Sequence, residues 1–173
     1  KLKYDLKTFN DSTTVILAME QKELEMGNLT AQHVIRAMDE GMNLVVVIGW
    51  GGGYNVLFGG KDMALAKDDF AALKSLVAAR RTAGNKLKIG VPTGSQQHLK
   101  LSYLLKNLGI DGGKDVDIVN IPFPNHVRAV DGKEVDMAMT IASFAALAVN
   151  ATGAKVFHHL YGAGAGRWEI GQA

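Results

Sequence analysis

The segment VPTGSQQH, residues 91–98, combines residue types that can hold an anion. Gly94 permits a ligand to approach the backbone closely, and Ser95, Gln96 and Gln97 are expected to open a helix. The free N–H groups and the dipole at a helix start favour negative charge, so this segment could cradle an oxyanion or a carboxylate. The alternative is that Ser95 only caps the helix. This segment alone leaves both interpretations open.

A second glycine-rich segment, GWGGGYNVLFGG (49–60), carries two large aromatic residues. Its glycines would let Trp50 and Tyr54 face a cleft and stack on a planar or apolar part of a ligand. The alternative is a loop in which Trp50 packs on its own lobe. The segment lacks the Gly-Lys-Ser/Thr of a phosphate-binding loop, and YGAGAGRWEIG (161–171) lacks the helix that a dinucleotide fingerprint requires. We therefore expect no cofactor.

No pattern of titratable residues indicates catalysis or a metal site. The five histidines form no HxxxH pair, and the adjacent His158 and His159 would point to opposite faces of a strand. His33 and His126 follow expected strand ends and could line a cleft, although a structural role is the alternative. Because the chain contains no cysteine, disulfides, thiolate chemistry and cysteine metal ligands are excluded. We expect no catalytic residue and no metal.

The composition is that of an ordinary soluble protein. Of the 173 residues, 47% are hydrophobic and 21% are charged, which allows one domain with a full core or two small ones. The net charge of +2 comes with no stripe of basic residues, so nucleic acid is not an expected partner. The longest apolar run, about 44–48, is far too short to span a membrane. No signal peptide is visible, so the chain would be cytosolic, mature or cut from a longer polypeptide.

One phrase occurs twice. LAMEQKELEMGNLTA (17–31) and RAVDGKEVDMAMTIA (128–142) align at an offset of 111 positions, which brings Lys22 onto Lys133. Around each copy the periodicity predicts the order βαβαβ, with strands at 2–6, 24–29 and 44–48 in the first and at 115–121, 135–139 and 154–161 in the second. Helices are expected at about 11–19, 31–41, 125–131 and 142–152. Alternating strands and helices predict an α/β fold with mostly parallel sheets and two lobes of one design.

The second lobe has more elements in front of its repeat. A helix is expected over 68–84 with Asp68 as its cap, then a strand at 87–91 and a helix over 95–109. We expect lobe 1 at 1–58, lobe 2 at 59–163 and the start of a return segment at 164–173. The first βα unit and the C-terminal part of the fold are expected to lie outside this chain. The segment 56–67 is predicted to be the hinge on which the lobes close around a ligand.

In open parallel sheets, ligands bind beyond the carboxyl ends of the strands. The residues expected there are rich in hydroxyls and amides and poor in carboxylates. Our candidate ligand-binding residues are Ser12, Thr13, Gln32, His33, Trp50, Tyr54, Thr93, Gly94, Ser95, Gln96, Gln97, Asn125, Thr140 and Ser143.

With these features in place, the chain resembles the solute-binding proteins of ABC importers for nitrate, sulfonates, taurine, bicarbonate and thiamine-precursor pyrimidines. The resemblance rests on LAMEQKELEMGNLTAQHVIRAMDEGMNLVVV, on KIGVPTGSQQHLKLSYLLKNLGI and on VNIPFPNHVRAVDGKEVDMAMTIASFAALA, and above all on their order and spacing in the chain. It implies a two-lobed, type II periplasmic-binding-protein-like fold, with Ser95 and nearby amides on the anionic group of the ligand. Ser12, Thr13, Gln32, His33 and Trp50 would line the opposite wall.

Two departures limit what the resemblance implies. The enzymatic relatives that make the thiamine pyrimidine carry a cysteine-rich motif, which this chain lacks. The loop after VDMAM reads TIAS, without the Trp-Pro-like feature common there, so the ligand class is not transferred.

The expected function is that of an extracytoplasmic protein, periplasmic or lipid-anchored outside the cell, with its signal segment removed. It would act as a monomer, capture a small anionic or polar organic solute between its lobes and deliver that solute to the permease of an ABC importer. The alternatives are a two-lobed enzyme such as a transferase, or an effector-sensing domain of a transcription regulator. Since the strand-end loops offer little titratable chemistry, binding is favoured over catalysis.

Overall fold

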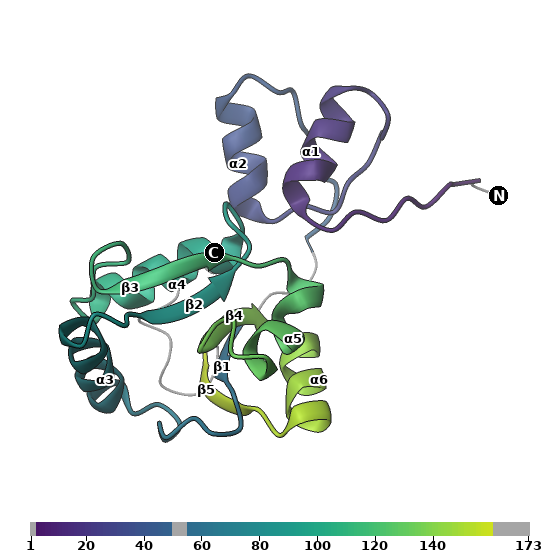
Figure 1. Ribbon diagram of the computed structural model, residues 1–173. Coiled ribbons are helices and arrows are strands. Elements are labelled where there is room, and N and C mark those ends of the chain that lie inside the picture. The colour runs from purple at the N-terminus through teal and green to yellow at the C-terminus, as the bar shows by residue number, and fades with distance from the viewer. Residues whose placement is uncertain (1–2, 50–54, 161–173) are drawn as a thin grey trace. The chain divides into compact units, whose positions relative to one another are not determined.

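The computed structural model of the chain describes residues 3–49 and 55–160. The chain divides into two compact units, residues 1–50 and 51–173, and each is described by itself (Figure 1). The first unit contains helices α1 (Ser12–Glu20) and α2 (Ala31–Asp39). The second contains β1 (Asn55–Gly59), α3 (Phe70–Thr82), β2 (Leu87–Val91), α4 (Gln96–Asn107), β3 (Val116–Asn120), the 3₁₀ helix η1 (Phe123–Asn125), α5 (His126–Asp131), β4 (Met137–Ile141), α6 (Ala142–Thr152) and β5 (Lys155–His159). None of the helices in these ranges has the length and apolarity that crossing a bilayer requires.

The first unit is a pair of packed helices. Asp11 caps α1, because its Oδ1 accepts a hydrogen bond of 2.8 Å from the N–H of Thr14. Small side chains let the helices approach, and Ala18 of α1 and Ala37 of α2 are both buried. The connecting segment returns over α1 at Gly27, where an added Cβ would lie 2.6 Å from Cγ1 of Val15. Only glycine fits this close approach without a shift of the neighbouring side chains.

The repeated phrase folds into the same helix end in both units. α1 and α5 each end in a turn that places a lysine in the left-handed region, with φ of 60° at Lys22 and 58° at Lys133. Three backbone hydrogen bonds close this turn in each copy, at the same offset of 111 positions. In the first copy the N–H groups of Gln21, Lys22 and Glu23 donate to the carbonyls of Leu17, Met19 and Ala18, respectively. In the second, the N–H groups of Gly132, Lys133 and Glu134 donate to the carbonyls of Arg128, Val130 and Ala129. The phrase therefore occurs twice because it encodes one turn geometry.

The helices that follow this turn also correspond. α2 begins at Ala31 and α6 at Ala142, which keeps the offset of the turn. Ala37 and Ala148 occupy the same place in the repeat, and both are buried. The duplication of the helix, the turn and the next helix is confirmed.

The strands predicted in the first unit are not formed in residues 3–49. The segments expected to pair, 3–6, 24–29 and 44–48, form neither helix nor strand and have no ladder partner among the described residues. Val45 to Ile48 are 67–81% exposed. The strand prediction is wrong for these segments because a β-strand requires a neighbour that satisfies its backbone N–H and C=O groups. In the second unit the equivalent segments have such neighbours.

The second unit is built on one five-stranded sheet in the order β3-β2-β4-β1-β5. β2 pairs in parallel with β3 and β4, whereas β1 lies antiparallel between β4 and β5. Four of the five strands therefore run in one direction. The expected α/β class with a mostly parallel sheet flanked by helices is confirmed.

Helices cover both faces of this sheet, which explains why its strands read as apolar runs. On one face, α3 and α4 bury Leu73, Leu101 and Leu104 against Leu57 and Ile89 of the sheet. On the other face lies a smaller cluster that joins α5 and α6 to the sheet, with Ala129, Val130, Ala148, Phe58 and Ala138.

Most predicted elements of the second unit are present, with one displaced cap. α3 begins after Asp69, whose Oδ1 accepts from the N–H of Ala72, and not after Asp68 as predicted. Asp68 is engaged elsewhere. Its N–H donates to the carbonyl of Phe157 on β5, and its Oδ1 lies 2.7 Å from Nδ1 of His158. Asp68 thus bonds to β5, which is distant in sequence, and Asp69 is the N-cap of α3 in its place.

β1 changes the hinge prediction. Its residues Val56, Leu57 and Phe58 are buried and pair on both sides. A hinge within 56–59 is therefore wrong, because rotation there would break two ladders at once. The lobe boundary predicted at residue 58 also falls inside this strand.

The lysine turns lead to a stability prediction. A non-glycine residue in the left-handed region costs about 1–2 kcal/mol, and glycine removes that cost at the expense of greater freedom in the unfolded chain. Lys133→Gly should therefore raise the free energy of unfolding by about 0.5–1 kcal/mol in urea denaturation. Lys133→Ala is the control, since it also removes the 3.6 Å ion pair with Asp62 but keeps the Cβ. Equal stability of the two variants would contradict the strain argument.

Candidate functional site

Polar residues of the second unit gather where three neighbouring parallel strands end. β2, β3 and β4 are adjacent and run in the same direction, so their carboxyl ends form one edge of the sheet. We call it the carboxyl edge; it comprises residues 92–97, 120–126 and 140–144. It brings together eight of the residues selected from the sequence: Thr93, Gly94, Ser95, Gln96, Gln97, Asn125, Thr140 and Ser143.

Ser95 is the N-cap of α4. Its Oγ accepts from the N–H of His98 at 3.1 Å, and its own hydroxyl donates to the carbonyl of Pro92 at 2.6 Å. The hydroxyl proton and one lone pair are thus engaged within the protein. The cap interpretation of Ser95 is confirmed, whereas its contact with a ligand stays a prediction.

The loop before α4 is also bonded to its surroundings. Asn120, at the end of β3, accepts from the N–H of Thr93 at 2.9 Å. Nδ1 of His98 accepts from the N–H of Gly94 at 3.1 Å, and φ at Gly94 is 78°, in the region that favours glycine. Asn120 was missed by the sequence analysis, although an asparagine directly after a strand is a usual partner for a neighbouring loop. Most backbone donors of this loop are therefore satisfied within the described residues.

Gln97 points into the protein. Only 8% of the residue is exposed, and its Nε2 donates to Oδ1 of Asn55 at 2.6 Å. Asn55 opens β1, and its backbone carbonyl accepts from the N–H of Leu160 beyond β5. This buried amide pair joins the start of α4 to the strand at which the described chain enters the sheet. Gln97 thus lies at the carboxyl edge, but its side chain forms a structural hydrogen bond inside the protein.

The opposite side of the carboxyl edge is built by η1, α5 and α6. His126 is fully buried, and its Nε2 lies 2.8 Å from the carbonyl of Ile121, so Nε2–H is the donor. Its ring packs edge-on to Phe123, which lies parallel to Phe144 with ring centroids 6.2 Å apart. Burial lowers the pKa of His126, and the hydrogen bond to Ile121 opposes part of that effect. His126 is thus a structural residue and not a cleft residue.

α6 starts without a side-chain cap. Its N-cap is Ile141, which has no hydrogen-bonding side chain. Thr140 precedes it, is 0% exposed, and its Oγ1 has no hydrogen-bond partner within the described part of the chain. Ser143, in the first turn, is exposed, and so is Asn125 at the start of α5. This corner of the edge thus contains unused donors.

The candidates of the first unit lie at its two helix starts. Ser12 and Thr13 open α1, and Gln32 and His33 open α2. His33 is buried with its Nδ1 2.6 Å from the hydroxyl of Thr30, and its pKa is lowered mainly by burial and also by Arg36. Trp50 and Tyr54 lie outside the described residues.

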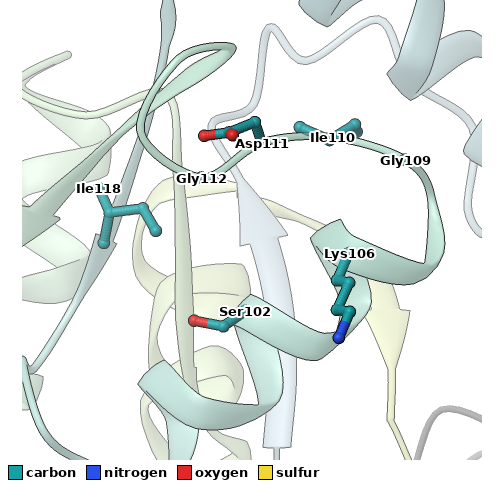
Figure 2. A pocket seen from close by; sticks show the side chains of 7 residues that line it. All are labelled: Ser102, Lys106, Gly109, Ile110, Asp111, Gly112 and Ile118. Carbon is teal, nitrogen blue, oxygen red and sulfur yellow. The ribbon is translucent and has the colours of Figure 1, made fainter.

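A separate depression lies away from the carboxyl edge. An open hollow of about 560 Å³ lies between the second half of α4 and the segment that leads into β3. Figure 2 shows the side chains that line it. Its polar groups are already engaged: Ser102 donates to the carbonyl of His98, and Asp111 accepts from the N–H groups of Gly113 and Lys114. These two amides lower the pKa of Asp111. The hollow is open, and both its serine and its aspartate are held by bonds within the protein, so we do not consider it a ligand site.

No group of three or more histidine, aspartate or glutamate side chains within 3–49 and 55–160 is arranged to hold a metal ion. Within the same ranges, the carboxyl edge offers hydroxyls, amides and helix starts. This chemistry suits the binding of a polar or anionic group.

The chain matches the model of the NMT1-like family over residues 3–158. A comparison with curated protein sequences finds no match.

Several solved structures have a similar fold. The periplasmic aliphatic sulphonate binding protein SsuA of Escherichia coli is 17% identical, with a TM-score of 0.61 over 85% of this chain and 44% of that protein. The alkanesulfonate-binding protein SsuA of Xanthomonas axonopodis pv. citri, bound to MOPS, is 16% identical, with a TM-score of 0.65 over 90% and 50%. A ligand-binding component of an ABC-type import system from Staphylococcus aureus, with zinc bound, is 18% identical, with a TM-score of 0.66 over 87% and 48%. The chain thus spans about half the length of these proteins, and the likeness establishes the fold.

The buried histidines lead to a pH prediction. Because the pKa of His126 is lowered on folding, the unfolded chain binds a proton below its ordinary pKa of about 6.5 that the folded chain does not bind. The contribution of His126 to the free energy of unfolding should be constant above this pH and should decrease as the pH falls below it. His126→Gln, which keeps a donor for the carbonyl of Ile121, should flatten the decline in urea denaturation series. Adding His33→Gln should flatten it further, and an unchanged decline in the double variant would contradict this assignment.

Proposed function

The chain belongs to the NMT1-like family, and from this premise we propose that it is the solute-binding part of an ABC import system. The observation that carries the proposal is the family match over residues 3–158, together with the fold shared with solved binding proteins. These proteins are named as binding proteins and not as enzymes. We therefore propose binding without chemical conversion, in place of the transferase-like alternative.

The proposed solute is a small organic anion. Two of the similar proteins are named for sulfonates, and a protein from Pseudomonas aeruginosa of the same fold is named as a component of a phosphonate transporter. The carboxyl edge supports an anionic solute because its helix starts and hydroxyls are donors, and because it carries no carboxylate among its described residues. The partly buried rings of Phe123 and Phe144 at the same edge would suit the apolar part of such a solute.

The residues proposed for solute contact in the second unit are those of the carboxyl edge. Thr93, Gly94, Gln96 and the start of α4 supply one side, and Asn125, Thr140 and Ser143 supply the other. The helix starts of the first unit, with Ser12, Thr13, Gln32 and His33, are proposed as a further set, as are Trp50 and Tyr54. The partner of the complete protein would be an ABC permease, its place would be outside the cytoplasmic membrane, and its state would be monomeric.

Titration calorimetry with a panel of anions tests the proposal. The panel contains ethanesulfonate, taurine, MOPS, ethylphosphonate, nitrate and bicarbonate, with neutral ethylene glycol as control. We expect micromolar binding of at least one organic anion, which corresponds to about 8 kcal/mol of binding free energy, and none of the neutral compound. Native mass spectrometry of the protein as purified should show the same ligand class if a solute is retained. Absence of binding to the whole panel would contradict the proposal.

Trp50 offers a second readout of the same experiment. If it contacts the solute, its fluorescence should change on binding in a Trp168→Phe background, which leaves Trp50 as the single tryptophan of the chain. A titration that gives heat without any change in fluorescence would remove Trp50 from the proposed site.

A further inference from the structure

The carboxyl edge contains two starts of long helices, and they differ in what their donors already do. At α4, the side chain of Ser95 caps the N–H of His98, and the loop before it is bonded to Asn120 and His98. At α6, the N-cap is Ile141, whose side chain makes no cap hydrogen bond. The first-turn N–H groups of any α-helix lack partners within the helix, so those of α6 depend on a group from elsewhere.

A second observation marks the same place. Thr140 lies on the sheet face that α6 covers, because its side chain alternates with Met139 and shares a face with Ala138, which packs with Ala148 of α6. α6 begins two residues after it, so its hydroxyl lies beneath the start of the helix. That hydroxyl is fully buried and has no hydrogen-bond partner within residues 3–49 and 55–160.

An unpaired buried hydroxyl destabilises a protein, so valine would be the better residue here for stability alone. A polar residue that opposes stability is expected where binding requires it. The only other unpartnered atom of this corner that the described residues show is Nδ1 of His126. It is an acceptor while Nε2–H donates to Ile121, so it does not suit an anion.

We propose that the anionic group of the solute binds at the start of α6, where it accepts hydrogen bonds from the first-turn N–H groups and from the hydroxyl of Thr140. This inference rests on the proposed function and assigns the charged group of the solute to one of the two helix starts. The aromatic rings of Phe123 and Phe144 adjoin this position, since Phe144 belongs to the first turn of α6. They give an apolar wall to the organic part, which makes an organic anion a better ligand than inorganic sulfate.

The test is the isosteric substitution Thr140→Val, which removes the hydroxyl and keeps the shape. We expect opposite changes in two measurements on the full chain. The Tm without ligand should rise by about 2–4 °C, because an unpaired polar group is lost from the interior. The Kd for ethanesulfonate should increase about tenfold or more, because a charge-assisted hydrogen bond is lost. Thr140→Ser, which keeps the hydroxyl, should retain most of the affinity.

Thr152→Val is the matched control. Thr152 lies at the other end of α6, and its hydroxyl donates to the carbonyl of Ala148 at 2.8 Å. This variant loses a satisfied hydroxyl, so its Tm should not rise and its Kd should equal that of the wild type. If Thr140→Val does not fold, Thr140→Ala removes the same hydroxyl and tests the affinity.

Three outcomes separate the claims. Wild-type protein that binds neither ethanesulfonate nor the rest of the panel would overturn the proposed function and this inference with it. Wild-type binding with an unchanged Kd in Thr140→Val would overturn this inference alone, even if the Tm rises. A larger loss of affinity in Ser95→Ala than in Thr140→Val would place the anion at α4 and would also overturn it.

Discussion

The second unit depends on the antiparallel insertion of β1 between β4 and β5. Without this strand, β5 would have no partner and the sheet would end at β4. Phe58 and Leu57 of β1 also reach into the cores on opposite faces, so the strand joins the two helix layers. Asn55 at its start receives hydrogen bonds from the side chain of Gln97 and the backbone of Leu160. The position of α4, and with it one side of the carboxyl edge, therefore follows from where β1 enters the sheet.

The carboxyl edge shows how a binding site can be separated from the interactions that hold the fold. Ser95, Gln97 and His126 resemble ligand residues by type and place, but their polar atoms serve a cap, a buried amide pair and a loop carbonyl. These bonds set the loops at fixed positions. The start of α6 and the hydroxyl of Thr140 have no side-chain cap and no hydrogen-bond partner, respectively, among residues 3–49 and 55–160, so a ligand could use them without displacing a bond seen there.

Local sequence patterns predicted much of the second unit. The helices, strands β2 to β5 and the cap at Ser95 follow from hydrophobic period and from side chains that bond within three or four residues. The duplication was also readable, because the turn at Lys22 and at Lys133 is closed by hydrogen bonds inside a single phrase. The strands of the first unit were not predictable in this way. Their apolar patterns are real, but a strand forms only when a second segment pairs with it.

The sequence by itself determined two features of the candidate site: the polar residues at the strand ends, and the helix starts whose dipole favours an anion. Both are properties of residue type and helix direction. Only the tertiary structure decided which of these polar groups remain available. Gln97 donates a hydrogen bond to Asn55, 42 positions away in the chain, and the N–H of Thr93 donates to Asn120. The hydroxyl of Thr140 has no hydrogen-bond partner within the described residues. Such pairings depend on the order of strands in the sheet, and that order is set by the packing of distant segments. A cap is encoded within one turn of chain, whereas the satisfaction of a buried side chain is a property of the whole fold.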